Sequence, residues 1–114
     1  MNYKMNIAKY LLLFRKWNSM TQTECGDMIG HSFQQWQKYE KGTNEMTAAK
    51  LLSVSANFKK AGNLFDMDAV INKSPEVYLE ELGEYHKHPA LYHWLRKAFT
   101  DKYYTSQETD ERNS

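Results

Sequence analysis

The chain has little cysteine: Cys25 is the single one among 114 residues, so neither an internal disulfide nor a thiolate metal cage can form. No apolar run approaches the ~18 residues that a membrane-spanning helix needs, and residues 1–9 are too polar to begin a signal peptide. With two prolines, five glycines and 41% apolar residues, the composition is typical of an ordinary globular chain. We therefore expect a soluble cytoplasmic protein that contacts no membrane.

Charge is distributed unevenly, although the net charge is only +1. Residues 1–60 hold nine Lys and Arg against four Asp and Glu, whereas residues 61–114 hold six against ten. A basic segment is attracted to a polyanion and an acidic one is repelled. The first half is therefore the part of the chain suited to approach a nucleic acid.

Apolar residues recur at helical spacing along most of the chain. Ile7, Leu11 and Phe14 fall on one face of a helix predicted over residues 6–17. A helix is predicted over residues 47–57, and the apolar side chains available for packing in and just after it are those of Ala48, Leu51, Leu52, Val54 and Phe58. The pattern after residue 60 predicts three more helices, over residues 64–72, 75–87 and 89–103, and a polar, disordered tail over 105–114. The sequence thus predicts an all-α fold.

Two short helices lie between these segments. Thr21 is an N-cap with Glu24 three residues later, which is the reciprocal capping-box arrangement. Gly30 ends this helix, and Ser32 caps the next one, over residues 33–41. Two short helices joined by a turn of three or four residues that contains glycine form a helix-turn-helix.

The stretch 20–42 resembles the helix-turn-helix of the lambdoid phage repressor and Cro family, also called the xenobiotic-response-element family. The matching features are Thr21-Gln22 at the start of the first helix, Gly30 in the turn, the apolar Trp36, and the closing Tyr39-Glu40-Lys41-Gly42. The resemblance covers residues 6–58. It departs from the family at Phe33, where a polar residue is more usual, and at Gly26, where alanine is usual and glycine should weaken the helix by up to ~1 kcal/mol.

The helix over 33–41 carries the candidate base-reading residues. Trp36 and Tyr39, at i and i+3, are expected to face the core and leave the polar residues outside. A glutamine amide can pair bidentately with the N6 and N7 edge of adenine in the major groove. By the resemblance, residues near the N-terminus of this helix reach the bases, so the candidate readers are Phe33, Gln34 and Lys38, with Ser32, Gln35 and Gln37 beside them. Phe33 suits a thymine methyl, and Lys38 suits guanine O6/N7 or a phosphate.

Phosphate contacts are expected on either side of that helix. By the resemblance, Gln22 donates to a backbone phosphate at the N-terminus of its helix, where free amides also favour an anion. Lys41, Thr43 and Asn44 resemble the second phosphate clamp of the family. Such contacts position the protein without reading the sequence.

The acidic, aromatic second half has no evident part in DNA binding. Because helix-turn-helix repressors bind paired half-sites as two-fold dimers, we expect residues 1–60 to bind DNA and residues 61–104 to form a homodimer or to bind a protein partner. The run 78–105, with Tyr85, Trp94, Arg96 and Tyr103-Tyr104-Thr105, also resembles the C-terminal part of anti-CRISPR-associated autoregulators, which are small phage repressors. The resemblance implies a homodimer that binds upstream of its own operon.

Other classes of function have less support in the sequence. His86, His88 and His93 invite a metal site, but no cysteine accompanies them and Pro89 interrupts the helix that would align them. The carboxylates Glu80, Glu81 and Glu84 fit an acidic, solvated helix face, and Cys25 fits a small buried hydrophobe. No catalytic triad, phosphate-binding glycine loop or CxxC pair is present, so we expect no enzyme, no metal and no cofactor.

The sequence therefore predicts a homodimeric, sequence-specific double-stranded DNA-binding protein. Its expected role is that of a transcriptional repressor of phage, mobile-element or bacterial origin, which occupies an inverted repeat. Two alternatives stay open: an antitoxin whose second half neutralises a partner, and a scaffold that binds RNA or protein instead of duplex DNA.

Overall fold

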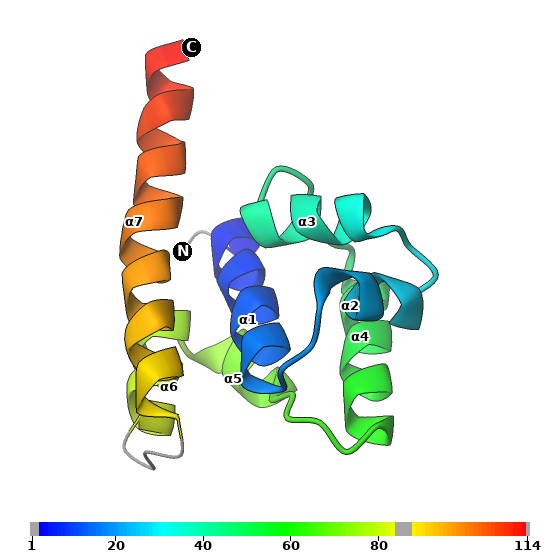
Figure 1. Cartoon of the computed structure of the whole chain (residues 1–114). Coiled ribbons are helices and arrows are strands. Elements are labelled where there is room, and N and C mark those ends of the chain that lie inside the picture. The colour runs from blue at the N-terminus through cyan, green and yellow to red at the C-terminus, as the bar shows by residue number, and fades with distance from the viewer. Residues whose placement is uncertain (1–2, 84–87, 114) are drawn as a thin grey trace. The chain divides into compact units, whose positions relative to one another are not determined.

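The computed structural model describes residues 3–83 and 88–113, with side chains as far as Asp101, and every regular element in these residues is an α-helix. The chain divides into two compact units, Met1–Pro75 (unit 1) and Glu76–Ser114 (unit 2). Unit 1 holds five helices: α1 (Tyr3–Trp17), α2 (Gln22–Met28), α3 (Phe33–Lys41), α4 (Ala48–Lys60) and α5 (Met67–Asn72) (Figure 1). Unit 2 holds α6 (Pro75–Gly83), apart from its first residue, and α7 (Pro89–Asn113). The prediction of an all-α fold is confirmed.

Local capping determines where the short helices of unit 1 begin. The Thr21 hydroxyl accepts the Glu24 amide at 3.0 Å, and the Glu24 carboxylate accepts the Thr21 amide at 3.1 Å. Ser32 caps α3 by accepting the Gln35 amide, and Thr47 caps α4 in the same way. These bonds satisfy amides that the first turn of a helix leaves without partners. The capping box and the N-cap at Ser32 are confirmed.

The turn between α2 and α3 depends on glycine at two positions. Gly30 has a φ of +71°, a left-handed conformation that residues with a Cβ rarely adopt. Gly26 lies inside α2, where a Cβ would approach the carbonyl oxygens of His31 and Ser32 to 2.7 and 2.9 Å. The sequence suggested only that Gly26 weakens the helix. In the structure its missing side chain lets the turn pass close to α2.

Four aromatic rings from α1, α4 and the segment before α5 build much of the core of unit 1. The ring of Phe14 lies 4.4 Å from that of Phe65 between centroids, Phe65 lies 5.3 Å from Phe58, and Tyr10 stacks on Phe14 at 5.7 Å. The Tyr10 hydroxyl also donates to the carbonyl oxygens of Ala69 in α5, at 3.0 Å, and of Lys73 just after α5, at 2.8 Å. Because these contacts tie α5 to α1, α5 belongs to unit 1, which extends as far as Pro75.

Two expectations about α1 and α4 need correction. Helix α1 starts at Tyr3, earlier than the predicted residue 6, and α4 extends to Lys60. Leu51, Val54 and Phe58 are buried as expected, but Ala48 is exposed and Leu52 is 58% exposed. Apolar residues occur around most of α4, so helical spacing alone could not identify the face that packs.

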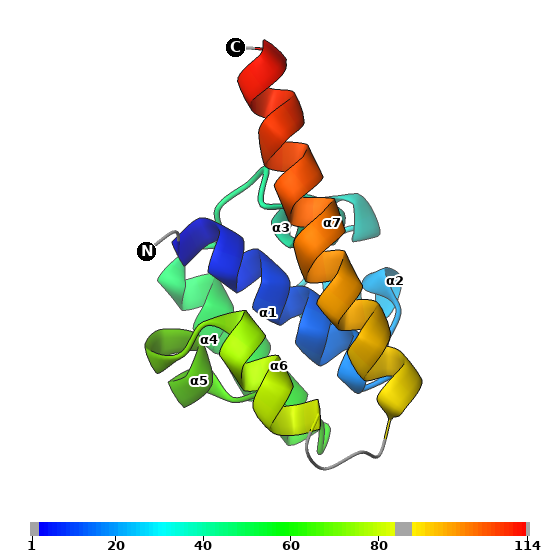
Figure 2. The same ribbon diagram turned by 90° about the vertical axis from the view of Figure 1, so that its left-hand side faces the viewer.

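Unit 2 is a pair of helices, α6 and α7 (Figure 2). They approach closely at Gly83, where an added Cβ would lie 2.6 Å from the Tyr92 ring. The Tyr92 hydroxyl donates to the Glu80 carboxylate at 2.8 Å, a bond that raises the pKa of Tyr92. Tyr78 is buried on α6, Leu82 is half-buried, and Tyr85 lies outside the described residues.

Helix α7 extends into the range that the sequence predicts to be a polar, disordered tail. It runs for 25 residues to Asn113, through most of the range 105–114. The sequence is compatible with a helix of this length, because no glycine or proline follows Pro89 to interrupt it. None of the helices in the described residues has the length and apolar character to cross a membrane.

Candidate nucleic-acid interface

The carboxylate of Glu40, near the C-terminus of α3, joins three helices of unit 1. It is fully buried and faces the guanidinium of Arg15 from α1, with 2.5 Å from Nε to Oε2 and 3.0 Å from Nη2 to Oε1. Such a two-point contact matches the planar geometry of both groups. The Arg15 charge therefore neutralises Glu40 inside the protein and fixes α3 against α1.

Two further donors bind this carboxylate. The indole Nε1 of Trp36, one turn earlier on α3, donates to Glu40 Oε2, and the amide Nε2 of Gln22 from α2 donates to Oε1 at 3.2 Å. The third nitrogen of Arg15 donates to the Met20 carbonyl, just before α2, at 3.1 Å. We call Arg15, Gln22, Trp36 and Glu40 the Glu40 cluster. Its bonds join α1, α2 and α3, so they hold α3 in one orientation.

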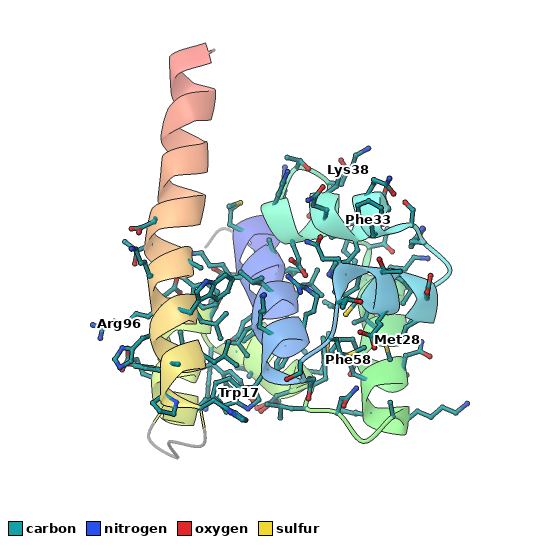
Figure 3. All side chains as sticks on the ribbon, in the orientation of Figure 1. Trp17, Met28, Phe33, Lys38, Phe58 and Arg96 are labelled. Carbon is teal, nitrogen blue, oxygen red and sulfur yellow. The ribbon has the colours of Figure 1, made fainter. Side chains whose placement is uncertain are left out.

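The opposite side of α3 is open to solvent. Phe33 is 44% exposed, and Gln34, Lys38 and Lys41 are exposed as well. Figure 3 shows Phe33 and Lys38 on the outer side of α3, whereas Phe58 lies in the interior of unit 1. We call Phe33, Gln34, Gln37, Lys38 and Lys41 the outer face of α3. The expected separation of a buried Trp36 from an exposed polar face is present.

Three of the other residues expected near the bases are less available. Gln35 and Gln37 are half-buried. Ser32 is exposed, but its hydroxyl oxygen already accepts the Gln35 amide at 3.2 Å, while its O–H can still donate. Tyr39, expected in the core, is half-buried and meets the His31 ring edge-on at 6.1 Å between centroids. The exposed candidate readers are therefore Ser32, Phe33, Gln34 and Lys38, and Ser32 among them also caps α3.

The candidate phosphate contacts differ in the freedom of their donors. The half-buried Gln22 directs one N–H at Glu40, which leaves the second N–H of the same amide for an outside acceptor. The Thr43 hydroxyl donates to the Lys38 carbonyl at 3.1 Å, so it can donate to a phosphate only if that bond opens. Lys41 and Asn44 are exposed.

The charge of α3 suits an anionic partner. Its exposed ionised side chains, Lys38 and Lys41, are both cationic, and its single acidic residue, Glu40, is buried and paired.

Cys25 is buried in α2, and burial, followed by the nearby Glu40 charge, raises the pKa of its thiol to about 12. The thiol is therefore protonated at neutral pH and is a poor nucleophile.

The histidines of the second half do not form a metal site in the part of the chain that the structure describes. His88 and His93 are exposed, and His86 lies outside the described residues. No group of three His, Cys, Asp or Glu side chains able to hold a metal occurs among the described residues.

The role of Arg15 was not visible in the sequence. The sequence indicates Glu40 only as part of the closing Tyr39-Glu40-Lys41-Gly42 motif, and no pattern in it singles out Arg15. The signal that could have found the pair is an acidic residue one turn after a core tryptophan, since a buried carboxylate requires a cationic partner. No local pattern indicates which cation, because the two residues are 25 positions apart.

Comparison with known proteins finds similarity to regulators of the helix-turn-helix (HTH) type. The chain is 43% identical over 56 residues to a protein of Sinorhizobium fredii (strain NBRC 101917 / NGR234) named uncharacterized HTH-type transcriptional regulator y4wC, a match over 49% of the chain and 39% of the relative. It is 35% identical over 65 residues to an uncharacterized HTH-type transcriptional regulator of Sinorhizobium medicae (strain WSM419), over 57% of the chain and 47% of the relative. No family model and no solved structure matches the chain. The chain spans less than half the length of these curated relatives, and over that span it is similar to HTH-type transcriptional regulators.

Proposed function

We propose that this chain is a sequence-specific double-stranded DNA-binding protein that acts as a homodimeric transcriptional repressor on an inverted repeat. The observation that carries the proposal is the exposure of Phe33, Gln34 and Lys38 on a short helix whose inner side is held by the Glu40 cluster. A rigid helix with outward amide and amine groups is what the major groove accommodates. The similarity to HTH-type transcriptional regulators supports the same function.

Within this proposal the outer face of α3 enters the major groove. Gln34 pairs with an adenine, and Lys38 donates to guanine or to a phosphate. Gln22 and Lys41 bind phosphates on either side, which fixes the register of the helix on the duplex. The bond from Gln22 to Glu40 supports this role because it orients the Gln22 amide before DNA arrives.

Repression follows from geometry in this proposal. Two copies related by a two-fold axis present their α3 helices to half-sites about 34 Å apart, and the bound dimer covers promoter elements. We propose that residues 61–104 supply the homodimer contact, which is consistent with the acidic and aromatic character of unit 2. Autoregulation of the protein's own gene is the simplest regulatory role for such a protein.

Selection of bound duplexes from a random pool, with the full chain, tests the proposal. Enrichment of an inverted repeat with half-sites one helical turn apart is expected, together with a dimer mass in analytical ultracentrifugation. Enrichment of a single half-site with a monomer mass would remove the homodimer. Failure to enrich any duplex, or stronger binding to RNA hairpins than to random duplex at the same salt, would overturn the proposed function.

Two substitutions separate base reading from phosphate binding. Gln34→Ala should weaken binding to the selected site by about 1–3 kcal/mol and relax base choice at one position. Lys41→Ala should weaken all duplexes alike and reduce the salt slope by about 1. The control is Lys59→Ala, an exposed lysine at the end of α4 remote from α3 (Figure 1), which should leave both properties unchanged. Equal behaviour of Lys41→Ala and Lys59→Ala would remove Lys41 from the interface.

A further inference from the structure

We propose that Phe33 reads the C5-methyl group of a pyrimidine, so that the protein distinguishes thymine and 5-methylcytosine from uracil and cytosine. This inference rests on the proposed function and adds a specificity-determining residue and a chemical group that it recognises. It implies that methylation of cytosine in DNA can create or strengthen a binding site for this protein.

Phe33 is the large apolar side chain that α3 leaves in solvent. It is the first residue of the helix, and 44% of its surface is exposed, while Trp36 on the inner side is fully buried. Contact between an exposed phenylalanine and an apolar group is stabilising, because it removes apolar surface from water. Phe33 lies at the N-terminal end of α3, and this end of a recognition helix comes nearest to the base edges.

The surroundings of Phe33 favour duplex DNA over an apolar protein surface. Gln34 beside it and Lys38 one turn after Gln34 are both exposed. The exposed charges of α3 are cationic, which suits the phosphates that flank a groove. The occupant must therefore be anionic overall and carry an apolar spot beside polar edges.

The major groove provides one apolar group that fits this description. The C5-methyl of thymine projects into the groove and is recognised by apolar side chains, including phenylalanine. Methylation of cytosine at C5 places the same group at the same position on a pyrimidine that pairs with guanine. Uracil and unmethylated cytosine lack it. A side chain that recognises the methyl group by apolar contact alone responds to its presence in either base.

The test uses the selected duplex and compares bases that differ only in this methyl group. Each T·A pair of the half-site is replaced in turn by U·A, and then by C·G and 5-methyl-C·G, symmetrically in both half-sites. At one pair, wild-type protein should bind the T duplex more tightly than the U duplex by about fourfold per half-site, which corresponds to ~0.8 kcal/mol for one buried methyl. At the same pair, the protein should bind the duplex with 5-methylcytosine more tightly than the duplex with cytosine, by a similar factor.

Two variants assign the effect to Phe33. Phe33→Ala should reduce both methyl ratios to about one, and low salt keeps its weaker binding measurable because phosphate contacts persist. Gln34→Ala is the matched control: it should weaken binding to the unmodified site and keep the methyl ratios. Circular dichroism confirms that each variant remains helical.

Three results would overturn the inference. The first is equal binding of T and U duplexes by wild-type protein at every pair. The second is a methyl effect that persists in Phe33→Ala, and the third is unchanged affinity of Phe33→Ala for the selected duplex, which would assign Phe33 to another partner. Each of these requires that a duplex was selected in the first place. Failure of the selection itself instead refutes the proposed function, so the two failures are distinguishable.

Discussion

Replacement of Glu40 by methionine should destabilise unit 1 far more than the loss of one surface charge. The substitution keeps most of the side-chain volume but leaves the guanidinium of Arg15, a residue that is 8% exposed, without its carboxylate partner. It also leaves the buried indole N–H of Trp36 without an acceptor. Breaking a buried ion pair by removing one partner costs about 3–5 kcal/mol, because an uncompensated charge remains inside.

Urea denaturation followed by circular dichroism measures this loss. Since small domains unfold with a dependence of about 1–3 kcal/mol per molar urea, a loss of about 4 kcal/mol should lower the midpoint by about 2 M. Glu45→Gln, which alters an exposed carboxylate in the loop after α3, is the control and should change stability by less than about 0.5 kcal/mol.

A double-mutant cycle with Arg15→Met isolates the pair. Each single variant strands one buried charge, whereas Arg15→Met/Glu40→Met strands neither, so the double variant should be more stable than the sum of the single effects by about 2 kcal/mol. Additive losses, or a Glu40→Met midpoint equal to that of Glu45→Gln, would refute the conclusion that this pair holds α3 in place.

The other predictions concern Gly26, His31 and Cys25, in the turn and its neighbours. Gly26→Ala should lower stability by about 1–3 kcal/mol despite the better helix propensity of alanine, since the new Cβ would lie 2.7 Å from the His31 carbonyl; a higher thermal midpoint would contradict this. His31→Leu should raise stability by about 1 kcal/mol, because Nε2 is the buried side-chain atom without a hydrogen-bond partner among the described residues, and an unchanged or lower urea midpoint would count against it. With its pKa raised to about 12 by burial, the Cys25 thiol should react with iodoacetamide at pH 8 much more slowly in folded than in urea-unfolded protein. The unfolded state ionises this thiol near pH 9 and the folded state does not, so Cys25 should also contribute a loss of stability as pH rises from about 9 towards 12, a loss that Cys25→Ala should remove.

The helix boundaries around the turn could be predicted because they depend on nearby residues. Thr21 and Glu24 satisfy each other's amides within one turn, and Gly30 and Gly42 adopt the left-handed conformation that ends helices. The burial of Trp36 also followed from its spacing on α3. These features need only local geometry, so the sequence determined the helix-turn-helix and the exposed side of its second helix.

Other features depend on which segments meet. Arg15 and Glu40 pair across 25 residues, and nothing in either neighbourhood identifies the partner. Leu52 is exposed because α4 has apolar residues around its circumference and the contacts of unit 1 select one face. From the sequence, Gly26 only weakens a helix, whereas in the structure the backbone of the turn packs closely against it. Local capping and periodicity are encoded in short stretches of chain, whereas packing partners are chosen by the whole core, and so only the tertiary structure revealed them.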